Sequence, residues 1–199
     1  MTTIKIAIVG PESTGKSSLA LALSRHFNTP FVREVARAYL EKHGPDYRYE
    51  DLKKIAKLQC EEEDLLLAAD PPLLICDTTL MVIKIWSEFK YQSCDDWIIT
   101  EEKSRSYDLF LLTDIDLPWE QDPLREHPDK RKELFTVYYR YLLRSNRPFH
   151  IVFGSDQERT NRAILLVTTF LKQRHYTVNS DKRNSENTDG NGNWVNLNF

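Results

Sequence analysis

The residues with the most specific chemistry stand near the start of the chain, in the run Gly10-Pro11-Glu12-Ser13-Thr14-Gly15-Lys16-Ser17. This run matches the pattern GxxxxGK followed by Ser or Thr, in which glycines let successive backbone N–H groups point inward at phosphate oxygens. The helix that follows directs the positive end of its dipole at the same anion. In this pattern Lys16 reaches the β- and γ-phosphates of ATP, and the Ser17 hydroxyl coordinates Mg²⁺. The predicted nucleotide-binding residues are Gly10, Glu12, Ser13, Thr14, Gly15, Lys16, Ser17 and Ser18.

Asp77 is the candidate for a second metal ligand, because it directly follows the apolar segment Leu73-Leu74-Ile75-Cys76. In P-loop proteins a carboxylate at the end of a strand shares Mg²⁺ with the hydroxyl of the phosphate loop. Asp is also a favoured residue at a helix N-cap, and a helical segment follows, so capping is the alternative interpretation. The phosphate loop favours the metal role, and we predict Ser17 and Asp77 as the metal ligands.

Glu34 follows the short apolar segment Phe31-Val32 and begins a helical segment that also carries Arg37. A carboxylate at this position can orient or deprotonate the hydroxyl group that accepts a phosphoryl group. Arg37 lies three residues further along the same helical face. A surface ion pair between the two side chains, with little effect on stability, is the alternative that these residues leave open.

The segment from Pro118 to Arg131 is polar and punctuated by prolines, and it carries Arg125, Lys130 and Arg131. A loop of this kind can close over a transferring phosphoryl group, supply positive charge and exclude water. We predict that the segment is a lid; a solvated charged loop is the alternative.

Five aromatic residues are candidates to stack on a planar ring of the substrate. Most aromatic side chains belong to the core of a protein, so each of the five has a structural alternative. They are Tyr39, Tyr47, Tyr49, Trp86 and Trp119.

These residues must be positioned by the elements around them, and strand-sized apolar segments alternate with helical segments along the chain. This order predicts an open parallel sheet with right-handed crossovers. Ligands of such sheets bind at the carboxyl ends of the strands. The predicted fold class is α/β, a P-loop NTPase fold like that of nucleoside and nucleotide kinases, with a five-stranded, mostly parallel sheet and helices on both faces. The predicted strands are 4–9, 31–32, 73–76, 109–112 and 151–153, and the predicted helices are 18–27, 34–43, 51–69, 80–89, 96–104, 130–144 and 159–174.

The composition is that of an ordinary globular protein, with 41% hydrophobic and 29% charged residues among 199. The formal net charge of −3 and the lack of a basic stripe argue against nucleic acid or an anionic membrane as a partner. No apolar stretch is long enough to span a bilayer. Cys60, Cys76 and Cys94 are widely spaced, which supports neither a disulfide framework nor a zinc site and favours the reducing cytoplasm.

The chain is expected to contain one folded domain, residues 1–177, followed by a polar tail. Residues 178–199 are rich in Asn, Ser, Asp and Gly. Such a segment cannot bury enough apolar surface to offset its ordering entropy, so we expect it to be disordered.

The motifs occur in the order found in the ribosylnicotinamide kinase domain of NadR-type proteins, which the chain resembles from about residue 3 to residue 175. The phosphate loop is followed by Glu34-x-x-Arg37, by Gln59 on a helix and by Asp77-Thr78 after a strand. The pattern continues with Tyr107-Asp108-Leu109-Phe110-Leu111-Leu112, with Pro118-Trp119-Glu120-Gln121-Asp122-Pro123-Leu124-Arg125, with Arg131, and with Gly154 and Arg159.

The resemblance implies transfer of the γ-phosphate of ATP to the 5′-hydroxyl of nicotinamide riboside, which yields nicotinamide mononucleotide in NAD salvage. It places Glu34 and Asp77 at the acceptor and the metal, Arg125 and Arg131 in the lid, and Arg159 near the adenine end of ATP. Together with the residue patterns above, this gives Lys16, Glu34, Asp77 and Arg125 as the predicted catalytic residues. The predicted substrate-binding residues are Glu34, Arg37, Tyr47, Tyr49, Asp77, Trp119, Asp122, Arg125 and Arg131.

Three residues depart from the family pattern. Thr79 stands where Asp-Thr-Asp commonly supplies a second carboxylate, and Arg33 stands where an aromatic residue can stack on nicotinamide. Pro123 replaces the glycine of a usual Asp-Gly, which stiffens the lid. The first two departures keep another nucleoside, or another small hydroxyl compound, open as the acceptor. Nothing in the chain resembles the adenylyltransferase and DNA-binding domains that accompany the kinase in full NadR proteins.

A regulatory NTPase or nucleotide switch is the alternative from another functional class. The sequence contains no Asn-Lys-x-Asp motif for reading guanine, and its Asp-x-x-Gly, Asp189 to Gly192, lies in the expected tail and follows no strand. A ring-forming AAA+ motor needs a further helical domain, for which the expected fold leaves no segment. These observations favour a small-molecule kinase.

Overall fold

The computed structural model describes residues 2–186, and the chain divides into two compact units, Met1–Ala163 and Ile164–Phe199. All five strands belong to the first unit, and the described part of the second unit is the continuation of the last helix. The strands are β1 (Ile4–Val9), β2 (Phe31–Val32), β3 (Leu73–Asp77), β4 (Leu109–Thr113) and β5 (Phe149–Val152). The helices are α1 (Lys16–Phe27), α2 (Val35–His43), α3 (Tyr49–Leu67), α4 (Leu80–Tyr91), α5 (Asp96–Ser104), the short 3₁₀ helix η1 (Pro128–Lys130), α6 (Arg131–Arg144) and α7 (Asp156–Glu186).

The strands form one parallel sheet in the order β2-β3-β1-β4-β5, which places β1 at the centre. β3 and β4, the neighbours of β1, are buried along their whole length, as expected for parallel strands covered on both faces. The register pairs Ile8 of β1 with Asp77 of β3. Because the phosphate loop follows β1 directly, this register brings Asp77 beside the start of that loop.

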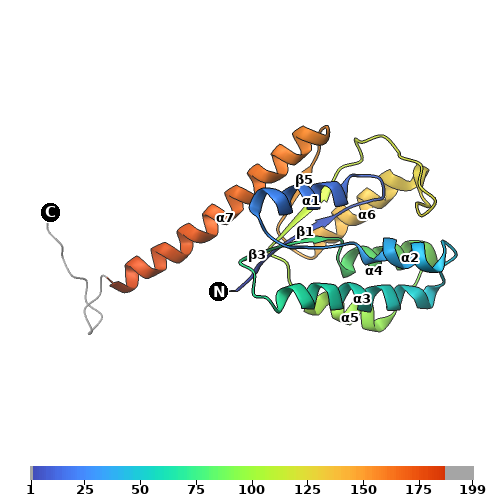
Figure 1. The fold of residues 1–199 in the computed structure, drawn as a ribbon, viewed down its shortest axis with the longest axis horizontal. Helices are drawn as coiled ribbons and strands as arrows, with labels where there is room; N and C mark the ends of the chain where they lie inside the picture. Colours follow the sequence, from blue (N-terminus) through green and yellow to red (C-terminus); the bar gives the residue numbers. More distant parts are fainter. Residues whose placement is uncertain (1, 187–199) are drawn as a thin grey trace. The chain divides into compact units, whose positions relative to one another are not determined.

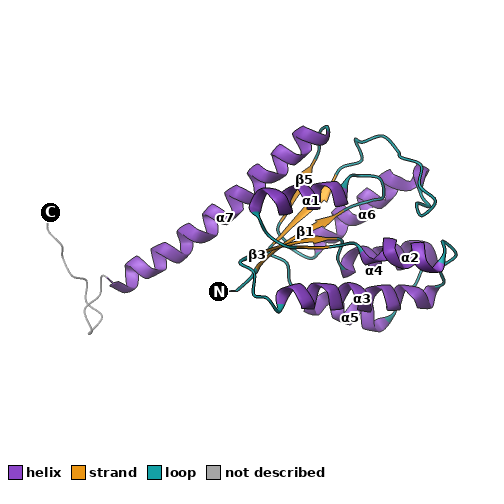
Figure 2. Cartoon of the chain, in the orientation of Figure 1, coloured by secondary structure: helices purple, strands orange, loops and turns teal. Residues whose placement is uncertain are grey.

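Helices cover both faces of the sheet (Figure 1). α1 packs on β1, β2 and β3 from one side, whereas α3 lies on the other side. Figure 2 shows the strands enclosed between these helical layers. On the side of α3, α4 and α6 pack on β1 and β4 through a cluster that includes Met81, Phe110 and Leu134. α2 joins α3, α4 and α5 in a second cluster, centred on Leu52 and Ile55. α2, α4 and α6 thus stand together beside the carboxyl ends of the central strands.

The structure confirms the predicted fold class, and all five predicted strands are present. The largest difference is at α7, which continues through Glu186, whereas we predicted a helix ending at Arg174 and a tail from residue 178. No glycine or proline occurs between Arg174 and Gly190, so no helix-breaking residue ends α7 where the prediction ended it. The rest of the predicted tail, residues 187–199, lies outside the described residues. No described helix is long and apolar enough to cross a bilayer.

Candidate active site

The phosphate loop connects β1 to α1, and its two glycines take conformations that other residues rarely adopt. Gly10 has a φ of +142°, and a Cβ atom there would lie 2.5 Å from Thr113 Oγ1 at the end of β4. Gly15 has a φ of +74° and is the N-cap of α1. The loop therefore passes close to β4 and turns directly into the helix, which leaves the first N–H groups of α1 facing an anion site.

Buried hydrogen bonds hold the loop in this shape. The Thr14 side chain contacts the Pro11 carbonyl oxygen at 2.8 Å and Thr113 Oγ1 at 2.7 Å. Arg159, which is only 2% exposed, donates to the Thr14 carbonyl oxygen at 3.0 Å and pairs with Asp116. Arg159 lines the same cavity as the loop, but its guanidinium is engaged by these groups. In the structure Arg159 therefore supports the loop, and the contact with adenine that the resemblance implies stays a prediction.

Asp77 is the last residue of β3 and is 1% exposed. Burial raises the pKa of its carboxyl group to about 6, and the charge of Glu34 adds to this shift, while Ser17 and Lys16 oppose it. Asp77 Oδ1 has no hydrogen-bond partner among the described residues. The capping alternative is wrong, since the N-cap of α4 is Thr79.

These observations fit a Mg²⁺ site. Mg²⁺ binds through one or two protein oxygens and otherwise keeps water and phosphate ligands, and it requires no cage of protein groups. The Asp77 carboxylate and the Ser17 hydroxyl are two suitable oxygens, and Asp77 Oδ1 has no hydrogen-bond partner among residues 2–186. In the part of the chain that the structure describes, no group of three His, Cys, Asp or Glu side chains could form a different metal site.

The two residues after Asp77 are also unusual. Thr78 has a φ of +74°, a conformation that costs a β-branched residue about 1–3 kcal/mol. Thr79 is the N-cap of α4, yet its side chain makes no capping hydrogen bond. Both hydroxyl groups are buried and lack a partner among the described residues. Where the family pattern has a second carboxylate, this chain therefore places buried hydroxyl oxygens.

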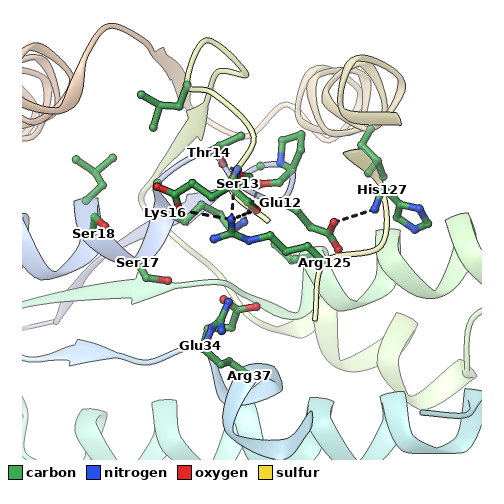
Figure 3. A pocket seen from close by; sticks show the side chains of 18 of the residues that line it. Glu12, Ser13, Thr14, Lys16, Ser17, Ser18, Glu34, Arg37, Arg125 and His127 are labelled. Carbon is green, nitrogen blue, oxygen red and sulfur yellow. Dashed lines mark hydrogen bonds and ion pairs between the residues drawn. The ribbon is translucent and has the colours of Figure 1, made fainter. Parts of the chain in front are cut away.

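Glu34 is the N-cap of α2 and lines the cavity beneath the phosphate loop (Figure 3). Its side chain makes no capping hydrogen bond. The surface ion pair with Arg37 is absent among the described residues, because Arg37 instead pairs with Asp122 at 2.8 Å and with Glu41 at 3.8 Å. The Asp122 carboxylate raises the pKa of Arg37. The Glu34 carboxylate therefore makes no ion pair with Arg37 and faces the cavity.

The predicted lid lies against the phosphate loop. Glu12 Oε2 accepts hydrogen bonds from the backbone N–H groups of Glu126 at 3.0 Å and His127 at 3.2 Å. Arg125 donates to Ser13 Oγ at 3.1 Å. Arg131 donates to the Ser13 carbonyl oxygen at 3.0 Å. These contacts contradict the alternative of a merely solvated loop, and Figure 3 shows Arg125 and Lys16 on the same side of the loop.

The lid also contacts the helices on the other side of the cavity. The Glu126 carboxylate accepts hydrogen bonds from Tyr47 at 2.6 Å and from Lys90 of α4 at 2.7 Å. Asp122 pairs with Arg37 of α2. The lid thus connects the phosphate loop to α2 and α4.

One cavity of about 540 Å³ joins these parts. Its polar end is formed by the phosphate loop, with Lys16 and Arg125, and Glu34 and Arg37 stand at the side of α2 (Figure 3). Its other end is mostly apolar and is lined by α2, α4, the lid and α6. The residues of this apolar compartment are Ala36, Leu40, Val82, Trp86, Phe89, Leu124, Leu134 and Tyr138.

The cavity brings together most of the predicted site residues, and several others lie outside its lining. Tyr47 is buried behind it, with its hydroxyl bonded to Glu126 and to the indole N–H of Trp86. Trp119 packs under the guanidinium groups of Arg125 and Arg131. The predicted residues that do not line the cavity are Tyr39, Tyr47, Tyr49, Asp77, Trp119, Asp122 and Arg131.

Sequence reasoning missed the contribution of α6 and much of that of α4. Leu134 and Tyr138 of α6, and Val82 and Phe89 of α4, line the apolar compartment. Burial raises the pKa of Tyr138, and the charges of Glu12 and Glu34 reinforce this shift. The helical spacing of the apolar residues in α4 and α6 predicts that one face of each helix is buried. It does not distinguish a face that packs in the core from one that lines a substrate pocket. Only Trp86 among the five aromatic candidates lines the cavity.

Two solved structures share this fold. A crystal structure of NadR protein in complex with NAD and AMP-PNP has a TM-score of 0.69 at 19% sequence identity, and the match covers 84% of this chain and 49% of that one. A crystal structure of NadR protein in complex with NR has a TM-score of 0.65 at 18% identity, with 84% and 51% covered. At these identities the similarity establishes the fold.

In sequence, the chain is similar to the trifunctional NAD biosynthesis/regulator protein NadR of Escherichia coli (strain K12), with 28% identity over 180 residues. The alignment covers 85% of this chain and 43% of that protein, so the chain spans less than half the length of this relative. Residues 5–159 match the AAA domain family. This range contains the phosphate loop, Glu34, Asp77 and the lid. The chain belongs to the AAA domain family, and its fold is that of a P-loop NTPase.

Proposed function

We propose that this protein is an ATP-dependent kinase that phosphorylates the 5′-hydroxyl of nicotinamide riboside. The observation that carries the proposal is a single cavity with two chemically different ends. One end is the phosphate loop, the other is the apolar compartment between α2, α4 and α6, and Glu34 lines the wall beside α2. This arrangement suits a small substrate that buries a ring and presents a hydroxyl group to ATP.

Phosphoryl transfer requires positioning and charge stabilisation, with little covalent chemistry by the protein. Lys16 and the N–H groups of the loop neutralise the phosphates, and Arg125 adds a second cation from the lid. Glu34 accepts a hydrogen bond from the acceptor hydroxyl and directs its oxygen at the γ-phosphate. Ser17 and Asp77 would hold Mg²⁺, which would supply further positive charge at the phosphates. The lid excludes water, which suppresses hydrolysis of ATP.

Nicotinamide riboside is the acceptor that the relatives favour. The related E. coli protein is described as trifunctional in NAD biosynthesis and regulation, and a NadR structure of the same fold holds NR. In this chain Trp86 and Phe89 provide aromatic surface for the nicotinamide ring in the apolar compartment. Arg33, which departs from the family pattern, is exposed and does not line the cavity. We place the reaction in the cytoplasm, since Cys60, Cys76 and Cys94 are all free thiols.

The proposal is tested by identifying the product. The protein is incubated with ATP, MgCl₂ and nicotinamide riboside, and the mixture is analysed by mass spectrometry for nicotinamide mononucleotide. A stoichiometric amount of mononucleotide and ADP is expected. ADP formed at the same rate without any acceptor, and with no mononucleotide, would instead identify a regulatory ATPase.

A further inference from the structure

Gln59 is a buried amide on α3 that contacts the main chain on both sides of Glu34. Only 2% of the surface of Gln59 is exposed to solvent. Gln59 Oε1 accepts a hydrogen bond from the Val35 N–H at 2.9 Å, and Gln59 Nε2 donates to the Arg33 carbonyl oxygen at 3.0 Å. Burying an amide is costly unless its donor and acceptor are both satisfied, and these two bonds satisfy them.

These two bonds hold the start of α2 without any bond from the side chain of Glu34. The side chain of an N-cap residue commonly accepts a hydrogen bond from an early N–H of its own helix. Glu34 is the N-cap of α2, but its carboxylate makes no such bond. Instead, the amide of Gln59 satisfies the first N–H of the helix, that of Val35. The Glu34 carboxylate makes no bond to the helix end and lines the cavity.

We infer that Gln59 is a positioning residue, which holds the backbone at Glu34 so that its carboxylate meets the acceptor hydroxyl. The inference rests on the proposed function, because it assigns Gln59 to the acceptor side of that reaction. Gln59 itself does not line the cavity and touches neither substrate site. It bonds the segment between β2 and α2 and the first residue of α2, whereas the phosphate loop connects β1 to α1. Its loss should therefore change the acceptor step and leave ATP binding intact.

The test compares Gln59→Met, which keeps the length of the side chain and removes the amide, with Glu63→Gln. Glu63 lies one turn further along α3, is equally buried, and bonds Lys5 and Tyr107 instead of the backbone near Glu34. We expect Gln59→Met to lower kcat for nicotinamide riboside by about tenfold to a hundredfold, with KM for ATP unchanged. Glu63→Gln should lower the free energy of unfolding without a comparable loss in kcat.

A double-mutant cycle shows whether Gln59 acts through Glu34. In a Glu34→Ala protein, the additional change Gln59→Met should cause less than about a twofold further loss in kcat. Losses that multiply, or a Glu63→Gln protein as impaired as Gln59→Met, would overturn the inference. If Gln59→Met does not fold, Gln59→Glu, which keeps the acceptor for Val35 and loses the donor to Arg33, is measured in the same cycle.

Amide hydrogen exchange, measured without any acceptor, tests the role of Gln59 independently of the proposed function. Amide hydrogen exchange at Val35 should accelerate in Gln59→Met, while exchange in the first turn of α1 stays as in the unchanged protein. Should nicotinamide riboside not be phosphorylated at all, the proposed function fails by itself. Unchanged exchange at Val35 in Gln59→Met would overturn the role of Gln59 in either case.

Discussion

At the scale of single residues, two residues at the end of β3, Asp77 and Thr78, are held in energetically unfavourable environments or conformations. Asp77 is buried with an unpartnered carboxylate oxygen, and burial raises its pKa to about 6. Thr78 holds a positive φ, and its hydroxyl also lacks a partner among the described residues. A structure retains such features when they serve binding or catalysis, and here they surround the proposed metal ligands.

Asp77→Asn should therefore stabilise the metal-free protein while it removes activity. The pKa of Asp77 is higher in the folded than in the unfolded state, so above pH 6 its ionisation disfavours folding. We expect the free energy of unfolding at pH 7.5, measured with urea, to rise by about 1–3 kcal/mol. Turnover with ATP and MgCl₂ should fall by at least about a hundredfold. Asp70→Asn, at an exposed position, is the control; a destabilised Asp77→Asn protein would contradict the account.

Arg125→Ala tests the cation that the lid contributes. The Arg125 guanidinium reaches Ser13 of the phosphate loop and lines the cavity. Because its charge is needed most in the transition state, we expect kcat to fall by about a hundredfold or more, with a smaller change in KM for ATP. Lys130→Ala is the matched control, since Lys130 is an exposed lid cation that pairs with Glu133. Equal effects of the two changes would remove Arg125 from this role.

At the scale of elements, the lid is fastened to the phosphate loop through Glu12. Its carboxylate accepts the backbone N–H groups of Glu126 and His127. Glu12→Ala should release this part of the lid, because each hydrogen bond to a charged group contributes about 1.5–3 kcal/mol. We expect trypsin to cleave after Arg125 at least about tenfold faster than in the unchanged protein. Asp129→Ala, at an exposed lid position, should leave the cleavage rate unchanged. An unaltered rate in Glu12→Ala would show that other contacts hold the lid.

The elements themselves were largely predictable from the sequence. The apolar runs of β1, β3 and β4 and the glycines of the phosphate loop are local signals, and each was confirmed. The order β2-β3-β1-β4-β5 was not predictable, because it depends on which strands pair across long crossovers. The continuation of α7 to Glu186 was missed because polar composition was given more weight than the absence of a helix breaker.

The site was predictable where a residue type alone restricts the chemistry. The phosphate loop, Glu34, Arg37 and Arg125, which were named from residue type and position, line one cavity, and their chemical roles stay predictions. Tyr47 and Trp119 do not, since an aromatic residue has the same sequence signal in a core and in a pocket. The same ambiguity hid Tyr138 and Phe89. The contacts of the lid depend on tertiary packing, for which loop sequences carry no periodic signal.

At the scale of the whole molecule, all described residues that line the cavity lie in the unit Met1–Ala163. A chain ending after residue 177 should therefore keep kcat and KM for both substrates within about twofold of the full chain. A larger loss of activity in the shortened chain, with its unfolding midpoint unchanged, would show that the last residues contribute to catalysis.

We propose that this protein transfers phosphate from ATP to nicotinamide riboside, and a panel of acceptors tests this reaction. ADP release is measured with ATP and MgCl₂ in the presence of nicotinamide riboside, of common ribo- and deoxyribonucleosides, or of no acceptor, and Lys16→Ala protein serves as the inactive control. We expect a kcat/KM for nicotinamide riboside at least about a hundredfold above that for any other nucleoside. Equal turnover of the nucleosides, or ADP release that no acceptor stimulates, would contradict it.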